Sequence, residues 1–191
     1  MNCKISNKLI NEFIISTPIG DLEIDCCPIG LHGLKFKNFV YSELICGKVK
    51  LKSIKNSNLI YESVNECLSY FETYFNLNEI DISKLIDPSI CWSSFCDHNS
   101  FRELILKTLT TQVLVGKRVS YKELSDLAGR PNAQRAVGTV MAKNPIPFII
   151  PCHRVVKSSN SKNKNENIGN YGCGVEIKKW LLNYESLYSN D

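Results

Sequence analysis

The sequence has no long apolar run and no secretory signal. No segment approaches the roughly 18 consecutive apolar residues that a membrane-spanning helix needs. Residues 1–13 also lack the continuous apolar stretch of a signal peptide. Internal repeats are absent as well. Since 43% of the residues are apolar, the chain can bury a core, and we expect an intracellular protein that does not bind membranes.

Support for a disulfide framework is also missing. The chain has nine cysteines, an odd number, and without a secretion signal these thiols are expected to stay reduced. Ordinary reduced thiols, a metal site and a catalytic thiolate are the roles that remain for them.

Charge is unevenly distributed along the chain. Residues 1–99 hold 9 Lys and Arg against 12 Asp and Glu, whereas residues 100–191 hold 14 against 7. A basic half of this kind is typical of a surface that meets a polyanion, usually the phosphate backbone of a nucleic acid. A solvated basic face is the alternative.

The first half of the sequence predicts a small sheet with one helix. Three strand-like runs, at 12–16, 21–26 and 31–37, are separated by Pro-Ile-Gly turns and predict an antiparallel meander. Apolar residues at helical spacing over 61–75 predict an amphipathic helix. Residues 42–58 are expected to form an irregular connection, and residues 76–99 a linker with one short ordered piece.

The second half predicts a helical domain. Ser100 with Glu103, and Ser120 with Glu123, have the pattern of a capping box, and each predicts a helix start. Further helices are expected over 133–143 and 175–188, the latter with Leu187 facing inward, and the polar segment 158–167 is expected to be a mobile loop.

Two short helices on either side of the break at 129–132 have the outline of a helix-turn-helix. The second of them carries small residues that let its backbone approach a groove closely, together with cations that suit phosphate. A tight helix crossing is the other explanation for the small residues. They are Ala133, Ala136, Gly138 and Ala142, and the cations are Arg135 and Lys143.

One pentapeptide carries the candidate chemistry, Pro151-Cys152-His153-Arg154-Val155. Basic neighbours stabilise a thiolate, which is the nucleophilic form of cysteine. A small core cysteine is the alternative. Because adjacent residues need not face each other, a water or a third group is expected to relay the proton.

This pentapeptide resembles the signature of the O6-alkylguanine-DNA alkyltransferases, the methylated-DNA–protein-cysteine methyltransferases. The resemblance covers about residues 100–187, with a looser likeness at 17–20 and 30–32. Further matching motifs are Ser120-Tyr121, residues 135–138, Asn144-Pro145, residues 169–171 and residues 178–182 through Glu185.

The resemblance implies a two-domain α/β protein. Residues 1–95 would form an N-terminal α/β domain with a small antiparallel, ribonuclease H-like sheet. Residues 96–191 would form a mostly α, winged-helix-like domain with a helix-turn-helix and the active cysteine. The implied activity is DNA repair by irreversible, single-turnover transfer of the alkyl group from O6-alkylguanine in double-stranded DNA to Cys152. O4-alkylthymine is left open as a second substrate, and a monomer in the nucleus is expected.

The resemblance also implies roles for single residues in the chemistry. Cys152 would accept the alkyl group, with His153 as its base through a water and Glu185 polarising the imidazole. Asn144 would brace the turn that carries the thiol, and Tyr121 would protonate or hydrogen-bond the leaving guanine.

Recognition of the damaged base is implied in the same way. The base would be flipped out of the duplex, Arg135 would fill the gap, and the helix-turn-helix would enter the minor groove. Other implied DNA contacts are Tyr121, Lys122, Ala133, Gln134, Ala136, Lys143 and Ser158. The implied base pocket comprises Met141, Val155, Ser158, Tyr171 and Gly172.

Two features depart from the animal members of the family. The loop at 157–168 is longer here, and Gly172 stands where those members tend to have serine. These differences affect the tolerance for bulky alkyl groups, while Cys173 adds a thiol without an assigned role.

Animal members carry a structural zinc ion in the N-terminal domain, held by cysteine and histidine. Cys27 and His32 match two of those ligands, Cys3 would supply a third, and Cys91 stands near the family's fourth, with His98 as a weaker substitute. Both residue types are good zinc ligands. An ordinary strand cysteine and turn histidine are the alternative.

Two other functions stay open at this point. A helix-turn-helix protein that binds damaged DNA or regulates transcription would need no reactive thiol. A Cys-His hydrolase would need an oxyanion hole and multiple turnovers, and nothing in the basic half indicates one.

Overall fold

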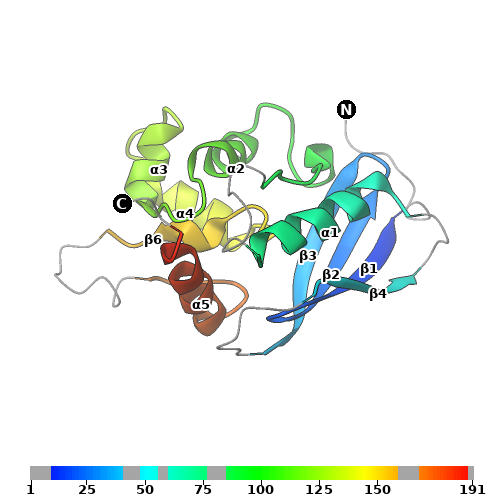
Figure 1. Ribbon diagram of the computed structural model, residues 1–191. Coiled ribbons are helices and arrows are strands. Elements are labelled where there is room, and N and C mark those ends of the chain that lie inside the picture. Colours follow the sequence, from blue (N-terminus) through cyan, green and yellow to red (C-terminus); the bar gives the residue numbers. More distant parts are fainter. Residues whose placement is uncertain (1–9, 41–47, 56–59, 77–84, 159–167, 189–191) are drawn as a thin grey trace. The chain divides into compact units, whose positions relative to one another are not determined.

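The computed structural model describes residues 10–40, 48–55, 60–76, 85–158 and 168–188 (Figure 1). Cys3 and most of the predicted mobile loop lie outside these residues. The chain divides into two compact units between Phe95 and Cys96. Across the described residues, no helix combines the length and the apolar character that a membrane span requires.

The first unit contains a four-stranded antiparallel sheet in the order β3-β2-β1-β4. The three N-terminal strands form the predicted meander, because each short turn brings the next strand back beside the last. Side chains on one face of these strands, including Phe13, Ile15, Leu22 and Ile24, are almost fully buried. The strands are β1 (Asn11–Thr17), β2 (Gly20–Cys27), β3 (Gly30–Phe39) and β4 (Lys50–Lys55).

Strand β4 corrects the expectation of an irregular connection over 42–58. It pairs with β1 at the edge of the sheet, where lysines are common because they discourage further pairing. Lys52 bonds Asp21 at 2.7 Å, and Lys55 pairs with Glu12. The polar composition that argued against a strand is therefore the composition of an edge strand.

Helix α1 (Glu62–Tyr74) lies along one face of this sheet (Figure 1). It occupies the predicted range and buries Val64, Cys67, Phe71 and Tyr74. The aromatic rings of Phe71 and Phe75 stack with centroids 6.3 Å apart. The helix thus closes the core of the first unit.

The segment after α1 is tied to the start of β3. The Leu31 amide donates to the Ser89 carbonyl at 2.9 Å, and the Cys91 amide donates to the Leu31 carbonyl at 3.0 Å. Gly30 permits this approach, because a Cβ there would lie 2.5 Å from the Ser89 oxygen. A 3₁₀ turn, η3 (Trp92–Ser94), follows and is the short ordered piece expected within 76–99.

The second unit is mainly helical, as predicted. Its helices and strands are α2 (Phe101–Gln112), β5 (Val119–Ser120), α3 (Tyr121–Leu127), α4 (Gln134–Ala142), the 3₁₀ turn η4 (Cys152–Arg154), β6 (Val155–Val156) and α5 (Val175–Ser186). Helix α5 ends before the expected residue 188. Leu187 is 68% exposed, so its predicted inward position is wrong, because it lies beyond the last helical turn.

The two predicted capping boxes differ in the structure. At α3 the box is complete, with Ser120 and Glu123 bonding each other's backbone amides. At α2 the Ser100 side chain accepts from the Glu103 amide, but the Glu103 carboxylate bonds the amide of Asn99 at 2.6 Å. The amide of Ser100 donates instead to the Asp97 carbonyl, so this amide is satisfied without the Glu103 carboxylate.

The turn of the helix-turn-helix is built around Ser125. Its hydroxyl bonds the Arg130 carbonyl and accepts from the Ala133 amide at 3.1 Å. Gly129 and Asn132 adopt left-handed φ values of 64° and 67°, a conformation that glycine and asparagine tolerate best. Strands β5 and β6 contact α3 and pair in parallel, with Val119 opposite Val155 and Ser120 opposite Val156.

Candidate active site

The thiol of Cys152 sits at the start of η4 and is only 7% exposed. Asn144 holds it in place. The Asn144 side-chain amide donates to Cys152 Sγ at 3.0 Å and to the Ile150 carbonyl at 2.8 Å. Its oxygen accepts from the Ile146 amide at 3.1 Å. One asparagine therefore closes the loop that ends at the thiol, as the predicted brace would.

Phe148 lies within this loop in an unusual conformation. Its φ is 82°, a region that costs a bulky residue of the order of 1–3 kcal/mol and is kept only when the surroundings enforce it. The side chain is fully buried, and its ring lies 6.1 Å from the His153 ring, centroid to centroid. Sequence reasoning missed this residue, since nothing in an apolar run indicates backbone strain.

His153, Glu185 and Arg154 form a buried network. His153 Nε2 lies 2.9 Å from Glu185 Oε1, and Arg154 bonds both carboxylate oxygens at 2.9 Å. The guanidinium also donates to the Val113 carbonyl at 2.8 Å. Arg154 thus acts on Glu185, and its expected role beside the thiolate is wrong, because its side chain turns into the core.

This network sets the charges at the site. Burial would raise the pKa of Glu185, but its interactions with His153 and Arg154 outweigh burial and hold that pKa well below the usual range. Burial lowers the pKa of His153, and Glu185 opposes this only in part. The imidazole is therefore neutral at physiological pH and can accept a proton.

The thiol itself is protonated at neutral pH. Burial raises the pKa of Cys152 to about 11, while Asn144 and Lys178 act to lower it. Within the described residues no hydrogen bond joins the thiol to His153, and the imidazole Nδ1 is buried without a hydrogen-bond partner. A proton leaving the thiol needs a relay, which agrees with the expectation for adjacent residues.

Lys178 is a second residue that sequence reasoning did not assign. It is fully buried, and its ammonium donates to the carbonyls of Val155 at 2.7 Å and Asn170 at 3.4 Å. Burial lowers its pKa to about 8. A sequence signal did exist, because Lys178 shares the inward helical face of α5 with Leu181, Leu182 and Glu185.

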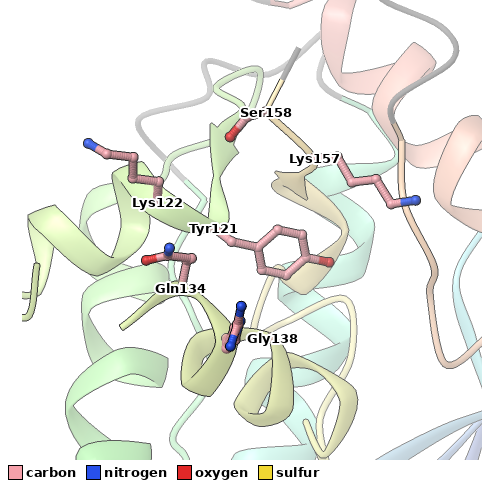
Figure 2. Close-up of a pocket in the computed structure, with 7 residues that line it drawn as sticks. Tyr121, Lys122, Gln134, Gly138, Lys157 and Ser158 are labelled. Atoms are coloured by element: carbon pink, nitrogen blue, oxygen red, sulfur yellow. The ribbon is translucent and has the colours of Figure 1, made fainter. Parts of the chain in front are cut away.

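A cavity of about 390 Å³ opens between the start of α3, helix α4 and the end of β6 (Figure 2). It brings together several predicted DNA contacts from these elements and adds Lys157, which was not predicted. The lining residues are Tyr121, Lys122, Gln134, Arg135, Gly138, Lys157 and Ser158. Helix α4 passes beside the Tyr121 ring at Gly138, where a Cβ would lie in ordinary contact with the ring at 3.9 Å.

The other predicted contacts lie outside this lining. Ala133 lies directly before α4, and Ala136 lies within it. Ala136 and Lys143 are exposed. The carbonyl of Lys143 accepts from Arg102 at 2.6 Å. Of the predicted base-pocket residues, Met141 and Val155 are buried, and Gly172 is exposed.

Two tyrosines flank the reacting groups. Burial is the main cause of the raised pKa of Tyr121, and the nearby Cys152 raises it further. Burial likewise raises the pKa of Tyr171 far above its ordinary value. The ring of Tyr171 meets the ring of His153 edge-on at 6.4 Å. Both phenols are thus neutral at physiological pH and able to donate a proton or a hydrogen bond.

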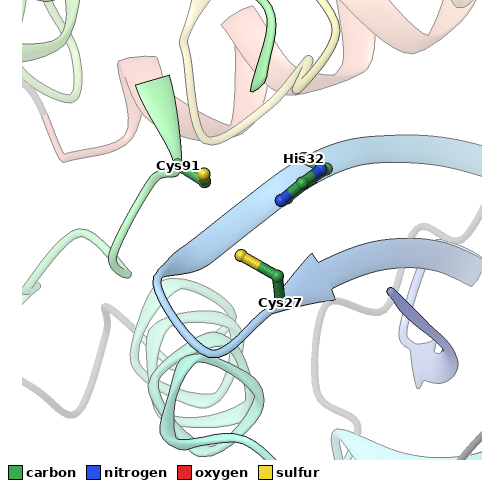
Figure 3. A group of neighbouring side chains, drawn as sticks. All are labelled: Cys27, His32 and Cys91. Atoms are coloured by element: carbon green, nitrogen blue, oxygen red, sulfur yellow. The ribbon is translucent and has the colours of Figure 1, made fainter. Parts of the chain in front are cut away.

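The first unit holds a separate group of potential metal ligands. The ligand atoms of Cys27, His32 and Cys91 lie within 4.8 Å of one another, and the three side chains converge (Figure 3). The Ile29 amide donates to Cys27 Sγ at 3.3 Å. Burial lowers the pKa of His32, which favours the neutral imidazole that binds metals. His98 lies elsewhere, 3.6 Å from Glu103.

Comparisons with known proteins agree with this arrangement. Residues 100–187 match the family described as 6-O-methylguanine DNA methyltransferase, DNA binding domain. The chain is 34% identical to the methylated-DNA–protein-cysteine methyltransferase of Rattus norvegicus, covering 91% of this chain and 81% of that protein. The human protein of that name is also 34% identical, with 90% and 78% covered.

Solved structures share the fold over nearly the whole chain. Mycobacterium tuberculosis OGT in complex with DNA is 26% identical, with a TM-score of 0.64 and 92% of each chain covered. The two-domain α/β fold predicted from the sequence is confirmed by this likeness. The chain belongs to the family of methylated-DNA–protein-cysteine methyltransferases.

Proposed function

We propose that this protein repairs O6-alkylguanine in double-stranded DNA by moving the alkyl group irreversibly to Cys152. The observation that carries the proposal is the placement of one thiol. Cys152 is held by Asn144 at 3.0 Å, follows a strained loop, and precedes a histidine bonded to a buried carboxylate. The family's activity on methylated DNA supports the same conclusion.

In the proposed reaction the bond from Cys152 Sγ to the alkyl carbon forms as the bond from that carbon to guanine O6 breaks. The thiol proton passes through a water to His153, and Glu185 stabilises the resulting imidazolium. Tyr121 donates a proton to the departing guanine and regains one from the His153 imidazolium through water. The net reaction therefore transfers the thiol proton to guanine, and the stable thioether limits each molecule to one turnover.

The cavity beside Tyr121 would receive the damaged base after it leaves the stack. Base flipping exposes the reacting atom to a buried nucleophile, which a base inside the duplex cannot reach. Arg135, on the wall of this cavity, would fill the gap left in the duplex. Tyr171, beside His153, would help to hold the base.

Peptide mass mapping tests the transfer and its acceptor together. The protein is mixed with a duplex that carries one O6-methylguanine, and its digest is compared with that of Cys152→Ala. We expect a stoichiometric gain of one methylene on the Cys152 peptide and none in the variant. Binding without a mass gain would instead indicate a lesion-binding protein, and multiple turnovers a hydrolase. A duplex with O4-methylthymine extends the test to that base.

A structural zinc ion is proposed for the first unit. Cys27, His32 and Cys91 supply three ligands of the kind that zinc prefers. The backbone bonds between Leu31 and the 89–91 segment fix Cys91 beside His32. Cys3, outside the described residues, is proposed as the fourth ligand. Metal analysis of purified protein below about a tenth of an equivalent would contradict this site.

A monomer in the nucleus is proposed as the working state. A chain of 21.6 kDa needs no strong signal to reach nuclear DNA. Light scattering of the purified protein tests the monomer, and imaging of a tagged chain tests the compartment.

A further inference from the structure

Lys157 lines the cavity with a charge that the protein itself does not neutralise. The exposed residue follows β6 and was not predicted to contact DNA. Lys122, another cation of the cavity, is bonded by Asp126 at 2.9 Å. For Lys157, no carboxylate among the described residues lies within 4.0 Å. One wall of the cavity thus presents a cation that is available to a ligand.

The fold determines where this cation lies. Ser120 pairs with Val156 in the parallel ladder. The residues that directly follow the two strands, Tyr121 and Lys157, therefore lie side by side. Figure 2 shows Lys157 on one side of the Tyr121 ring and Lys122 on the other. Two short strands therefore set the spacing between the phenol of the active site and the ammonium.

The aliphatic part of Lys157 lies near Gly169 and the Tyr121 hydroxyl. A Cβ on Gly169 would lie 3.5 Å from Lys157 Cγ, 3.8 Å from its Cε and 3.7 Å from the Tyr121 hydroxyl, which are ordinary contacts. Gly169 has a φ of 76°, so a side chain there would be strained. The methylene groups of a lysine can lie along the protein surface while its ammonium binds an anion.

We infer that Lys157 binds a phosphate of the lesion-bearing strand, next to the nucleotide whose base occupies the cavity. This inference rests on the proposed function. A nucleotide that places its base beside Tyr121 keeps its phosphates outside the cavity, on the surface where the exposed Lys157 lies. Phosphate contacts position a protein on DNA without reading sequence, so this residue fixes the register of the extruded nucleotide.

A competing role for Lys157 is electrostatic. Burial is the main cause of the lowered pKa of Lys178. The charge of Lys157 lowers this pKa further, whereas Cys152 raises it. By reducing the positive charge on Lys178, which lowers the pKa of Cys152, Lys157 would disfavour the Cys152 thiolate. The two roles predict different measurements, because a phosphate contact changes the salt dependence of binding whereas a field at the thiol changes the rate of transfer.

The experiment compares three variants of the full chain. Lys157→Met removes the charge and keeps the methylene groups, and Lys157→Arg keeps the charge. Lys179→Met is the matched control, since Lys179 is exposed and bonded to Glu176 at 2.9 Å. Affinity for a duplex with one O6-methylguanine is measured across a salt series. Single-turnover transfer is then measured at saturating DNA.

For Lys157→Met we expect the slope of log affinity against log salt to shrink by about 0.9, and binding to weaken roughly tenfold at about 50 mM salt. Lys157→Arg and Lys179→Met should match the wild type, and saturating DNA should restore the wild-type transfer rate. An unchanged slope in Lys157→Met would overturn the inference, and a faster transfer with that slope would assign the residue to the thiol. If the wild type binds DNA and transfers nothing, the proposed function fails, whereas the salt series still decides the phosphate contact.

Discussion

At the scale of single residues, Glu185 has the largest expected effect on stability. Its carboxylate neutralises the buried Arg154, which also donates to the Val113 carbonyl. Glu185→Gln should therefore destabilise the protein by about 3–5 kcal/mol at neutral pH, because it leaves a buried charge uncompensated. Urea unfolding measures this. Glu176→Gln, an exposed change on the same helix, should cost less than about 1 kcal/mol.

The pH dependence of this effect has a definite sign. The folded pKa of Glu185 is depressed, so its stabilisation is present above the unfolded pKa of about 4.3 and is lost as pH falls below that value, through the folded pKa. The stability difference between wild type and Glu185→Gln should narrow from neutral to strongly acidic pH. An equal difference at both would show that the carboxylate does not carry the effect.

His153 controls the pH dependence of transfer. Only its neutral form accepts a proton, and burial lowers its pKa from 6.5. The single-turnover rate at saturating DNA should be flat around neutral pH and decline below about 6.5, as pH passes through the lowered pKa. His153→Gln should lose roughly 10²–10⁴ in rate together with this acid limb. An identical acid limb in the variant would remove His153 from the role of base.

The same scale shows what sequence can reveal about the site. Cys152, His153, Asn144 and Glu185 were predicted, and the structure brings them together. Three features were not foreseen because they depend on tertiary placement. They are the strained Phe148 beside His153, the buried ammonium of Lys178, and the direction of Arg154 toward Glu185.

At the scale of elements, the first turn of α3 links stability to DNA binding. Ser120 caps this helix, belongs to β5 and directly precedes Tyr121. Ser120→Ala should cost about 1 kcal/mol of stability and weaken binding to the duplex, since the loosened turn carries a cavity residue. Ser100→Ala removes an equivalent bond at α2, 3.2 Å long, away from the cavity. Urea unfolding and duplex titration of both variants measure the two effects.

The outcome for the two caps separates the cavity from general stability. Both variants should unfold earlier by a similar amount, and only Ser120→Ala should bind DNA more weakly. Equal affinities in the two variants would show that the position of Tyr121 does not depend on the cap.

Elements were predicted well where local chemistry decides them. The meander, α1 and the helix-turn-helix follow from turn residues, helical spacing and caps, and all three are confirmed. Strand β4 was missed because its lysines suit an edge whose partner, β1, lies about 40 residues earlier in the chain. The β5–β6 ladder has only two residues in each strand, too few for a periodic signal. Yet that ladder places Tyr121 beside Lys157.

At the scale of the whole molecule, the two units divide the chemistry. The ligands of the potential metal site described above belong to the unit that ends at Phe95. Cys152 and the cavity beside Tyr121 belong to the unit that begins at Cys96. The excess of Lys and Arg over Asp and Glu also lies in residues 100–191, the half proposed to contact phosphate. We therefore expect a metal bound in the first unit to support the folding of that unit.

This division makes the effect of zinc on stability a direct test of the first unit. Zinc that binds the folded state alone stabilises that state by an amount that grows with the logarithm of the zinc concentration relative to the dissociation constant. A chelator should accordingly lower the midpoint of the wild type, and zinc should restore it. Cys27→Ala should lose this response, because it removes one of three converging ligands. Cys26→Ala is the matched control, since adjacent strand residues point to opposite faces, and its midpoint should still respond to zinc. If both variants respond alike, Cys27 is not a ligand, and the bond from the Ile29 amide to its sulfur is an ordinary feature of the turn.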